Sequence, residues 1–232
     1  MKSPLSNLFK TPVAEILSGF TDWHCHILPG VDDGFRTVED SLEALSEYEK
    51  AGIRSVWFTP HIMEDIPNET ADLKAAFETL RRAYSGPVVL NLASENMLDF
   101  LFERRLAEKD FLPFSGRRLL IETSYYNPPM NFDNILGRIK SAGFFPVLAH
   151  PERYMYMDNA RYRSLHDSGI KFQINLPSLT GFYGQSVKER AEWLLENGLC
   201  DLTGTDLHRI RDFALLKEEH LGRKYADAVN GR

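Results

Sequence analysis

Short apolar runs alternate along the chain with stretches of helical periodicity, and this alternation limits the fold more than any other feature of the sequence. Seven of the runs are predicted to be β-strands, since they lie between turn residues and are rich in apolar side chains. They cover residues 20–24, 55–59, 88–93, 119–123, 146–149, 172–175 and 201–205. Strands that alternate with helices form a parallel sheet through right-handed crossovers. Seven such units predict an α/β fold, a distorted (β/α)7 TIM-like barrel with parallel strands and one unit fewer than the usual eight.

The segment between the first two strands illustrates the helical pattern. Leu42, Leu45 and Tyr48 recur at spacings of three residues, which places them on one face of a helix. Thr37 is a candidate N-terminal cap, and Gly52 marks the end of the pattern. Similar patterns cover residues 68–84, 97–109, 131–143 and 186–198.

The composition is typical of one globular domain. Hydrophobic residues make up 43% of the chain, and no linker-like or low-complexity stretch divides it. We therefore expect a single domain over residues 1–232, with an N-terminal extension at residues 1–19 and a barrel core at about residues 20–210.

Charge and hydropathy argue against several classes of partner. The chain has 27 basic and 33 acidic residues, a net charge of −6 and no polybasic block, which disfavours nucleic-acid binding. No apolar run reaches the ~18 residues that span a bilayer, so no membrane insertion is expected. The N-terminus lacks the continuous apolar stretch of a secretory signal, which favours a cytoplasmic location.

The two cysteines do not form the catalytic loop of a cysteine-dependent phosphatase. That loop requires an arginine six positions after the cysteine, but Val31 follows Cys25 and Asp206 follows Cys200 at this spacing. Cys25 also alternates with two histidines on a predicted strand, so its side chain should point away from them. We expect it to be a small buried apolar group.

Acidic and imidazole side chains follow six of the seven predicted strands. They are His24, His26, Asp33, His61, Glu95, Glu122, His150, Asp206 and His208. The sixth strand, which ends in Asn175, offers no such side chain. In a parallel barrel the C-terminal ends of the strands meet on one face, so these nine side chains are predicted to converge in one pocket.

The residue types in this pocket indicate a centre for several metal ions. His24 and His26 lie two residues apart on a strand, so both can face the same ion. Five histidines and four carboxylates exceed the roughly four ligands of one zinc ion, which favours two or three ions with a bridging carboxylate. The mixture of nitrogen and oxygen suits manganese, iron or zinc better than calcium or magnesium. Asp22 is expected to support the ligands, while His166 and His220 fall in helical stretches outside the pocket.

Four motifs, "DWHCH", "TPH", "LAHPERY" and "GTDLH", follow one another in the order that is typical of the PHP family of polymerase and histidinol phosphatase domains, which the chain resembles. More narrowly, "HCHILPGVDDGFRTVEDSLEAL" together with "LAHPERY" resembles the bacterial manganese-dependent protein-tyrosine phosphatases encoded beside capsule and exopolysaccharide genes. The similarity covers about residues 20–208. It implies a distorted seven-stranded barrel with a trinuclear metal site, in which the nine side chains named above are the ligands.

The resemblance also implies an activity and further site residues. The expected reaction is hydrolysis of phosphomonoesters, with phosphotyrosyl protein as substrate, by water that the metal ions activate for in-line attack on phosphorus. Arg153 of the "HPERY" motif matches an arginine that holds the substrate phosphate, and either Arg209 or Arg211 would be the second arginine. His208 or a metal-bound water would supply a proton to the leaving group.

Aromatic residues of two loops are further candidates for the rim of the pocket. Tyr154 is expected to contact the phosphotyrosine ring, together with Tyr125, Tyr126 and Tyr156. The same side chains could instead cover the mouth of the barrel without touching the substrate.

Three alternatives to a protein-tyrosine phosphatase remain at this stage. A small-molecule phosphatase of the histidinol-phosphatase type would use the same metal ions. A phosphodiesterase or nuclease is disfavoured by the lack of a basic run, and a non-catalytic metal-stabilised protein would show closed coordination. For the main interpretation, the resemblance implies a capsule-associated tyrosine kinase with a phosphorylated tail as a partner.

Overall fold

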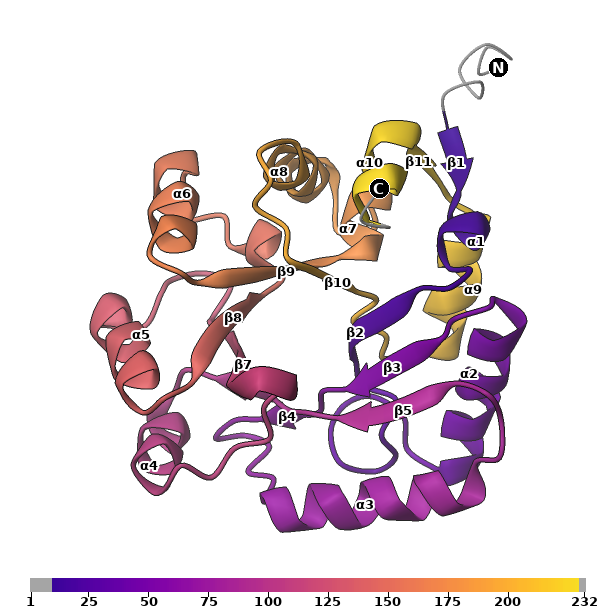
Figure 1. The fold of residues 1–232 in the computed structure, drawn as a ribbon, viewed down its shortest axis with the longest axis horizontal. Coiled ribbons are helices and arrows are strands. Elements are labelled where there is room, and N and C mark those ends of the chain that lie inside the picture. The colour runs from indigo at the N-terminus through magenta and orange to yellow at the C-terminus, as the bar shows by residue number, and fades with distance from the viewer. Residues whose placement is uncertain (1–9, 230–232) are drawn as a thin grey trace.

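The computed structural model describes residues 10–229, in which parallel strands in the middle of the molecule are surrounded by helices (Figure 1). The strands are β1 (Lys10–Pro12), β2 (Thr21–Cys25), β3 (Ser55–Phe58), β4 (His61–Ile62), β5 (Val89–Leu92), β6 (Glu95–Met97), β7 (Arg118–Glu122), β8 (Phe145–Ala149), β9 (Lys171–Asn175), β10 (Leu202–Gly204) and β11 (His220–Gly222). The helices are α1 (Val13–Ile16), α2 (Val38–Lys50), α3 (Thr70–Ala83), α4 (Phe100–Glu108), α5 (Phe132–Ser141), α6 (Asn159–Asp167), α7 (Leu176–Thr180), α8 (Gln185–Glu196), α9 (Ile210–Glu218) and α10 (Arg223–Val229), with 3₁₀ turns η2 (Ser115–Arg117) and η3 (Pro151–Arg153).

The parallel strands form two sheets that adjoin each other. One has six strands in the order β10-β9-β8-β7-β6-β4 and curves as a half-barrel, and the other has the order β2-β3-β5. The backbone N–H of Asp206, just after β10, donates to the carbonyl of His24 on β2 at 2.7 Å. The N–H of His26 donates in turn to the carbonyl of Leu207 at 3.0 Å. The end of the six-stranded sheet is thereby hydrogen-bonded to the first strand of the smaller sheet.

All seven predicted strands occur in the structure, and no boundary differs from the prediction by more than one residue. The short strands β4 and β6 were not predicted. They continue the runs of β3 and β5 after short breaks at residues 59–60 and 93–94, and they carry His61 and Glu95. Because of these breaks, β4 and β6 pair in the six-stranded sheet, whereas β3 and β5 pair in the three-stranded sheet.

Helix α2 begins and ends where the sequence predicts. The hydroxyl of Thr37 accepts a hydrogen bond from the N–H of Asp40, and the Asp40 carboxylate accepts one from the N–H of Thr37. This reciprocal capping box satisfies two N–H groups that the first turn of a helix leaves free. Leu45 and Tyr48 are fully buried, so the predicted apolar face does pack against the sheet.

Inside the curved sheets, a small cluster of apolar side chains fills the space at the end opposite the predicted metal ligands. The rings of Trp23 and Trp57 stack with centroids 5.6 Å apart, and Phe114 packs edge-on against both. Leu120 and Val147 belong to the same cluster. The interior is thus a packed core rather than a pore, and polar groups are left for one end only.

The predicted N-terminal extension is part of the core where the structure describes it. Strand β1 pairs antiparallel with β11, and Val13, Ile16 and Leu17 have no exposed surface. His220, predicted to be helical, lies in β11 and is exposed. The packed region therefore extends beyond both ends of the predicted barrel core, because β1 and β11 pair with each other.

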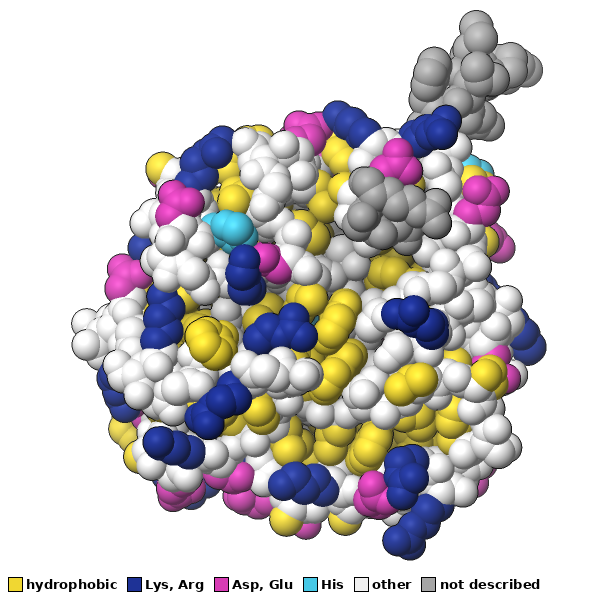
Figure 2. Space-filling model, in the orientation of Figure 1, with side chains coloured by type: hydrophobic (Ala, Val, Ile, Leu, Met, Phe, Trp, Pro, Cys, Tyr) yellow, Lys and Arg dark blue, Asp and Glu magenta, His cyan; other side chains and the backbone are white. Residues whose placement is uncertain are grey.

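The surface has groups of mixed sign. The face in Figure 2 has hydrophobic side chains near its middle, and Lys and Arg lie scattered around them rather than in one patch. Within residues 10–229, no helix combines the length and the apolar character that a bilayer span requires.

A buried carboxylate connects β2 to the segment that follows β10. Asp22 accepts hydrogen bonds from the Tyr48 hydroxyl at 2.6 Å, and from the N–H and hydroxyl of Thr205 at 2.8 and 2.6 Å. Burial raises the pKa of Asp22 despite these donors. The carboxylate of Asp22 therefore supports the backbone beside His24, as predicted. It makes no hydrogen bond to the side chain of any of the nine predicted ligands.

Replacing Tyr48 by Phe is expected to destabilise the protein by about 1–3 kcal/mol, because the buried Asp22 carboxylate loses a donor. For a chain of this size the melting temperature should fall by roughly 2–4 °C per kcal/mol, which thermal unfolding followed by circular dichroism will measure. Tyr225→Phe removes an exposed hydroxyl that donates to Glu196 at 2.7 Å and serves as the matched control. Equal shifts for the two variants would contradict a structural role for the buried network.

Candidate metal centre

The nine predicted ligands lie at the same end of the parallel strands and come together there. Three groups have ligand atoms within 4.8 Å of one another: His26, Asp33, His61 and His208; His24, His26 and Asp206; and His61, Glu95 and Glu122. The ninth residue, His150, has its Nε2 atom 3.0 Å from Oε1 of Glu95. Convergence of side chains from six strands, as the sequence predicts, is therefore present in the structure.

Glu95 is the central carboxylate of this cluster. Its Oε2 atom lies 3.1 Å from Nε2 of His24, 3.3 Å from Nε2 of His26 and 3.2 Å from Nδ1 of His61. Its Oε1 atom faces His150. A carboxylate whose two oxygens each lie beside imidazole nitrogens could bridge two cations.

Asp206 is the second carboxylate that joins different parts of the centre. Its Oδ1 atom lies 3.4 Å from Nε2 of His26 and 3.6 Å from Nε2 of His24. Its Oδ2 atom accepts hydrogen bonds from Arg153 at 3.1 Å and from the side-chain amide of Asn175 at 2.7 Å. One oxygen thus faces the histidines and the other is held in place by neighbours.

Asp33 and His208 form the outer edge of the centre. Oδ1 of Asp33 lies 3.3 Å from Nε2 of His208 and 3.7 Å from Nε2 of His61. The Asp33 side chain is 65% exposed, whereas His24, His26 and Glu95 have no exposed surface. A substrate can therefore reach the centre from this side.

Two residues that the sequence did not single out orient the innermost histidines. Nδ1 of His24 lies 2.7 Å from Oε1 of Gln173, and Nδ1 of His26 lies 2.7 Å from Oδ2 of Asp32. Because each of these oxygens accepts a hydrogen bond from an Nδ1–H group, the Nε2 atoms of both histidines face the centre. No sequence pattern distinguishes Asp32 from the adjacent Asp33 for this role. No local pattern points to Gln173 either, because its partner His24 lies 149 positions away in the sequence.

Backbone geometry also positions the ligands. His150 and Asp206 have φ angles of 34° and 54°, in the left-handed region that residues other than glycine rarely adopt. A Cβ atom on Gly34 would lie 2.1 Å from the carbonyl oxygen of His26, and one on Gly204 would lie 2.7 Å from the backbone N of His24. Only glycine allows these close approaches. The neighbouring histidines, His26 and His24, therefore restrict both positions to glycine.

Electrostatic attraction within the cluster outweighs the cost of burial. Burial disfavours protonation of His24, yet the carboxylates of Glu95 and Asp206 raise its pKa to about 9. Burial likewise disfavours ionised Glu95 and Asp206, but the imidazoles, first that of His24, hold the pKa of each carboxyl well below its usual range. A cation that binds here would take the place of imidazole protons, so binding is coupled to proton release.

The residues present fit a set of divalent cations. Nδ1 of His61 and Oε1 of Glu122 are buried 3.0 Å apart without making a hydrogen bond. Nε2 of His24 and Nε2 of His26 approach to 3.1 Å, a distance at which two imidazole lone pairs require a proton or a cation between them. The donor set of nitrogen and carboxylate oxygen suits manganese, iron or zinc.

Arg153 lies at the edge of the metal centre between two aromatic rings. Its guanidinium carbon is 4.2 Å from the centroid of Tyr125 and 4.4 Å from that of Tyr183. Together with the hydrogen bond to Asp206, these stacked contacts hold the guanidinium plane in one orientation. Its side chain is 21% exposed, which leaves it accessible to a ligand from the solvent side.

The other predicted substrate contacts differ in their positions. Arg209 is exposed and lines a cleft of about 370 Å³ together with Asp33 and His208. Arg211 is not among the residues that line this cleft, and its Nε atom lies 3.9 Å from Asp212 on the same helix. Of the two alternatives, only Arg209 therefore lines the cleft beside Asp33 and His208.

Tyr154 does not have the predicted position on the rim. It has no exposed surface, and its hydroxyl accepts a hydrogen bond from the N–H of Thr123 at 3.1 Å. Its ring packs edge-on against His150 with centroids 5.7 Å apart. Tyr154 thus supports a ligand from behind, while Tyr125 and Tyr126 are exposed at the surface.

Comparison with known proteins identifies relatives over most of the chain. Residues 20–224 match the family described as capsular polysaccharide synthesis, CpsB/CapC. The tyrosine-protein phosphatase YwqE of Bacillus subtilis is 29% identical over 197 residues, which are 82% of this chain and 78% of YwqE. The tyrosine-protein phosphatase CpsB of Streptococcus pneumoniae is 28% identical over 201 residues, covering 82% of this chain and 83% of CpsB.

Solved structures agree with these matches. A chain from the crystal structures of YwqE from Bacillus subtilis and CpsB from Streptococcus pneumoniae, described as unique metal-dependent tyrosine phosphatases, is similar with a TM-score of 0.77 and 27% identity, covering 90% of this chain and 85% of that one. A lactonase from Listeria monocytogenes, at 12% identity, shares only the fold, with a TM-score of 0.54 over 92% of this chain and 85% of the lactonase. The matched family model spans nearly the whole described chain and includes all nine clustered side chains. The protein therefore belongs to the CpsB/CapC family of capsular polysaccharide synthesis proteins.

Proposed function

We propose that this protein is a metal-dependent protein-tyrosine phosphatase that acts on phosphotyrosyl protein in the regulation of capsule or exopolysaccharide synthesis. The observation that carries the proposal is the cluster of nine side chains around Glu95 and Asp206, with Arg153 fixed at its edge. The tyrosine phosphatase names of YwqE and CpsB support the same activity. A capsule-associated tyrosine kinase is the proposed partner, and the cytoplasm the proposed location.

The finer architecture belongs to the same proposal. We infer that the two sheets together make one distorted (β/α)7 barrel and that the chain forms a single domain. The hydrogen bonds between the segment after β10 and strand β2 support closure on one side. On the other side, the N–H of Ala93 donates to the carbonyl of Phe58 at 2.8 Å, just before β6 joins the larger sheet.

The proposed cofactor is two or three divalent metal ions, with manganese first and iron or zinc as alternatives. The nine proposed ligands are His24, His26, Asp33, His61, Glu95, Glu122, His150, Asp206 and His208. When bound, such ions would lower the pKa of water to supply a nucleophile near neutral pH and would neutralise phosphoryl oxygens. Four carboxylates contribute a charge of −4, which two or three dications balance or exceed, so a phosphate dianion can bind although the chain is acidic.

The chain's own residues bind and orient the phosphoester. Arg153 can donate two hydrogen bonds to phosphoryl oxygens, because Tyr125 and Tyr183 already hold its guanidinium plane. Arg209, beside Asp33, is the proposed second contact. His208, which is 25% exposed at the same edge, or a water bound by the ions is the proposed donor of a proton to the leaving group. A phenol leaves readily because its pKa is about 10, so little proton donation is needed.

Neither cysteine fits the role of nucleophile. Burial raises the pKa of Cys25 well above its usual value and that of Cys200 to about 12. Both thiols therefore stay protonated near neutral pH, and a protonated thiol is a poor nucleophile. Cys25 has no exposed surface and its Sγ donates to the carbonyl of Trp57, in agreement with the expected buried role.

Removal and return of metal ions test the proposed function. We expect chelation to abolish hydrolysis of phosphotyrosyl peptides and to lower the melting temperature, since ligands that bind only the folded state stabilise it. Added manganese should restore both, and calcium should not. The same holoenzyme should hydrolyse phosphotyrosyl peptide faster than histidinol phosphate, with no turnover of a phosphodiester. Metal-independent turnover, or a preference for histidinol phosphate or the diester, would contradict the proposal.

A further inference from the structure

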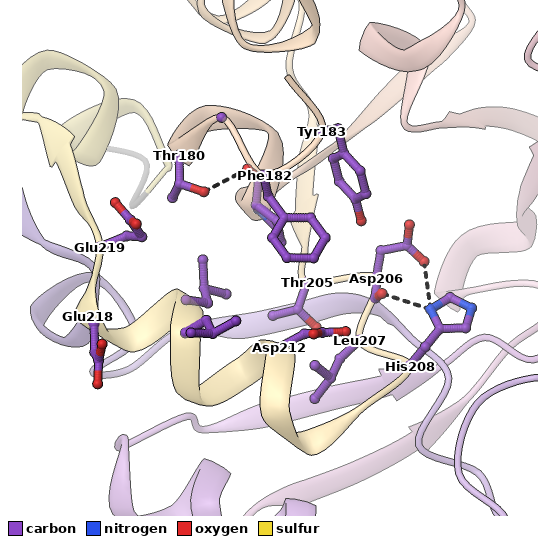
Figure 3. A pocket seen from close by; sticks show the side chains of 14 residues that line it. Thr180, Phe182, Tyr183, Thr205, Asp206, Leu207, His208, Asp212, Glu218 and Glu219 are labelled. Carbon is purple, nitrogen blue, oxygen red and sulfur yellow. Dashed lines mark hydrogen bonds and ion pairs between the residues drawn. The ribbon is translucent and has the colours of Figure 1, made fainter. Parts of the chain in front are cut away.

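A cavity of about 330 Å³ opens directly beside the metal centre. Asp206 and His208 line one end of it, and Glu218 and Glu219 line the other (Figure 3). Phe182 projects between the two ends in the same view. The volume is within the range of pockets that bind small ligands or the side chains of a peptide. A substrate bound at the metal centre would therefore have part of its structure in or above this cavity.

The walls between the two ends are largely apolar. Leu207 and Leu216 are buried beneath the cavity, while Phe182 and Leu215 face it with 51% and 50% of their surfaces exposed. Large apolar side chains that remain exposed beside a functional site are typical of a binding surface. Such walls favour an aromatic ring or the aliphatic part of a long side chain.

The end remote from the metal centre is acidic. Glu218 and Glu219 are exposed, and Asp212 lines the cavity between them and Leu207. Among the described residues, no Lys, Arg or His nitrogen lies within 4 Å of either glutamate carboxylate. The Asp212 carboxylate has a single ion-pair partner within residues 10–229, Arg211, at a nitrogen–oxygen distance of 3.9 Å. The negative charge at this end is therefore available to a cationic ligand.

The opposite end of the cavity adjoins the proposed phosphate site. Tyr183 lines the cavity and also stacks on Arg153, so the wall of the cavity is one side of the proposed phosphate site. A ligand that matches the whole cleft has a phosphate at one end, apolar groups in the middle and a positive charge at the other end. In a peptide, phosphotyrosine followed or preceded closely by Lys or Arg has this pattern.

We propose that the cavity is a specificity subsite that binds a Lys or Arg side chain near the phosphotyrosine of a peptide substrate. The aliphatic stem would pack on Phe182 and Leu215, and the charged head would reach Glu218 and Glu219. The inference rests on the proposed phosphatase function and adds the class of peptide that the enzyme prefers. Acidic residues at the same place in the substrate would be repelled.

Peptide pairs test this subsite without any variant. Phosphotyrosyl peptides that differ only by Lys, Gln or Glu at one position within two residues of the phosphotyrosine are compared by kcat/KM, using the manganese-loaded enzyme. For at least one position we expect Lys to exceed Glu by about tenfold, as two or three exposed charge pairs would give. The ratio should fall when the salt concentration rises, since exposed charges are screened.

A double variant locates the preference. Glu218→Gln with Glu219→Gln should reduce the Lys-to-Glu ratio of kcat/KM to about twofold or less, because the paired charges are gone. The matched control, Asp72→Asn with Glu108→Gln, removes two exposed carboxylates from α3 and α4, and should keep the wild-type ratio. Phe182→Ser should lower kcat/KM for the Lys peptide more than for free phosphotyrosine, through KM. Because each readout is a ratio, partial loss of folded enzyme does not alter it.

The outcomes separate this inference from the proposed function. Equal kcat/KM for Lys, Gln and Glu peptides at every position, with phosphotyrosine still hydrolysed, would overturn the subsite and leave the phosphatase activity in place. A Lys preference that persists unchanged in the double variant would also overturn it. No hydrolysis of any phosphotyrosyl substrate by the manganese-loaded enzyme would overturn the proposed function itself.

Discussion

Replacing Glu95 by Gln is expected to lower kcat by on the order of 10³-fold or more, because in the proposed metal centre this one residue would be a ligand to more than one ion. Its two oxygens lie within 3.3 Å of imidazole nitrogens of four histidines, and no other side chain of the cluster has this position. Gln has the same size but offers one neutral oxygen, and its NH2 group is a hydrogen-bond donor that cannot bind a cation. Turnover of p-nitrophenyl phosphate and metal content per chain, measured on the same sample, will check this result.

The control for Glu95 is Glu108→Gln, which makes the same chemical change at an exposed position on α4. It should keep both turnover and metal content. Circular dichroism should show that Glu95→Gln remains folded, because apolar packing around the strands does not depend on this carboxylate. A folded Glu95→Gln protein with full metal content and full turnover would exclude the bridging role.

The second large effect is expected at Arg153. Arg153→Ala should reduce kcat/KM by about 10²- to 10³-fold through loss of charge-assisted hydrogen bonds to the phosphoryl group. Arg153→Lys should recover little of this loss, because an ammonium group does not stack between two rings and cannot form two parallel hydrogen bonds. Steady-state kinetics on a phosphotyrosyl peptide will measure both variants.

The stacked tyrosines provide a finer test of the same arginine. Tyr125→Leu keeps an apolar side chain but removes one ring from the guanidinium, at 4.2 Å in the structure. We expect kcat/KM to fall by roughly three- to tenfold, within the range of a single cation–π contact. Metal content should stay unchanged in every variant of this series. An Arg153→Lys enzyme as active as the wild type would show that the planar, stacked guanidinium has no role.

The comparison of sequence and structure separates two kinds of information. The seven strands were predicted within one residue because short apolar runs between turn residues are a local signal. The convergence of the nine candidate ligands could be predicted because parallel strands bring their C-terminal ends to one face, so residue type and position after a strand suffice. Neither argument needs the details of side-chain packing.

Other features depend on contacts between distant parts of the chain. Tyr154 was expected on the rim but is buried, because the turn η3 directs its ring behind His150 towards Thr123. Gln173 orients His24 across 149 positions of sequence, a pairing that no local pattern encodes. The acidic cavity beside His208 likewise combines α7 with α9, which only the fold brings together.

The sequence by itself determined the alternation of strands and helices, the chemical types of the nine clustered side chains and the strand end at which each one lies. The tertiary structure alone decided that Asp32 orients His26 while Asp33 faces the solvent side, and that Arg209 rather than Arg211 borders the centre. The physical reason is the range of the interactions. Strand formation and capping depend on neighbours within a few residues, whereas the direction of a side chain at the rim depends on sheet curvature and on backbone approaches such as that of Gly204 to His24.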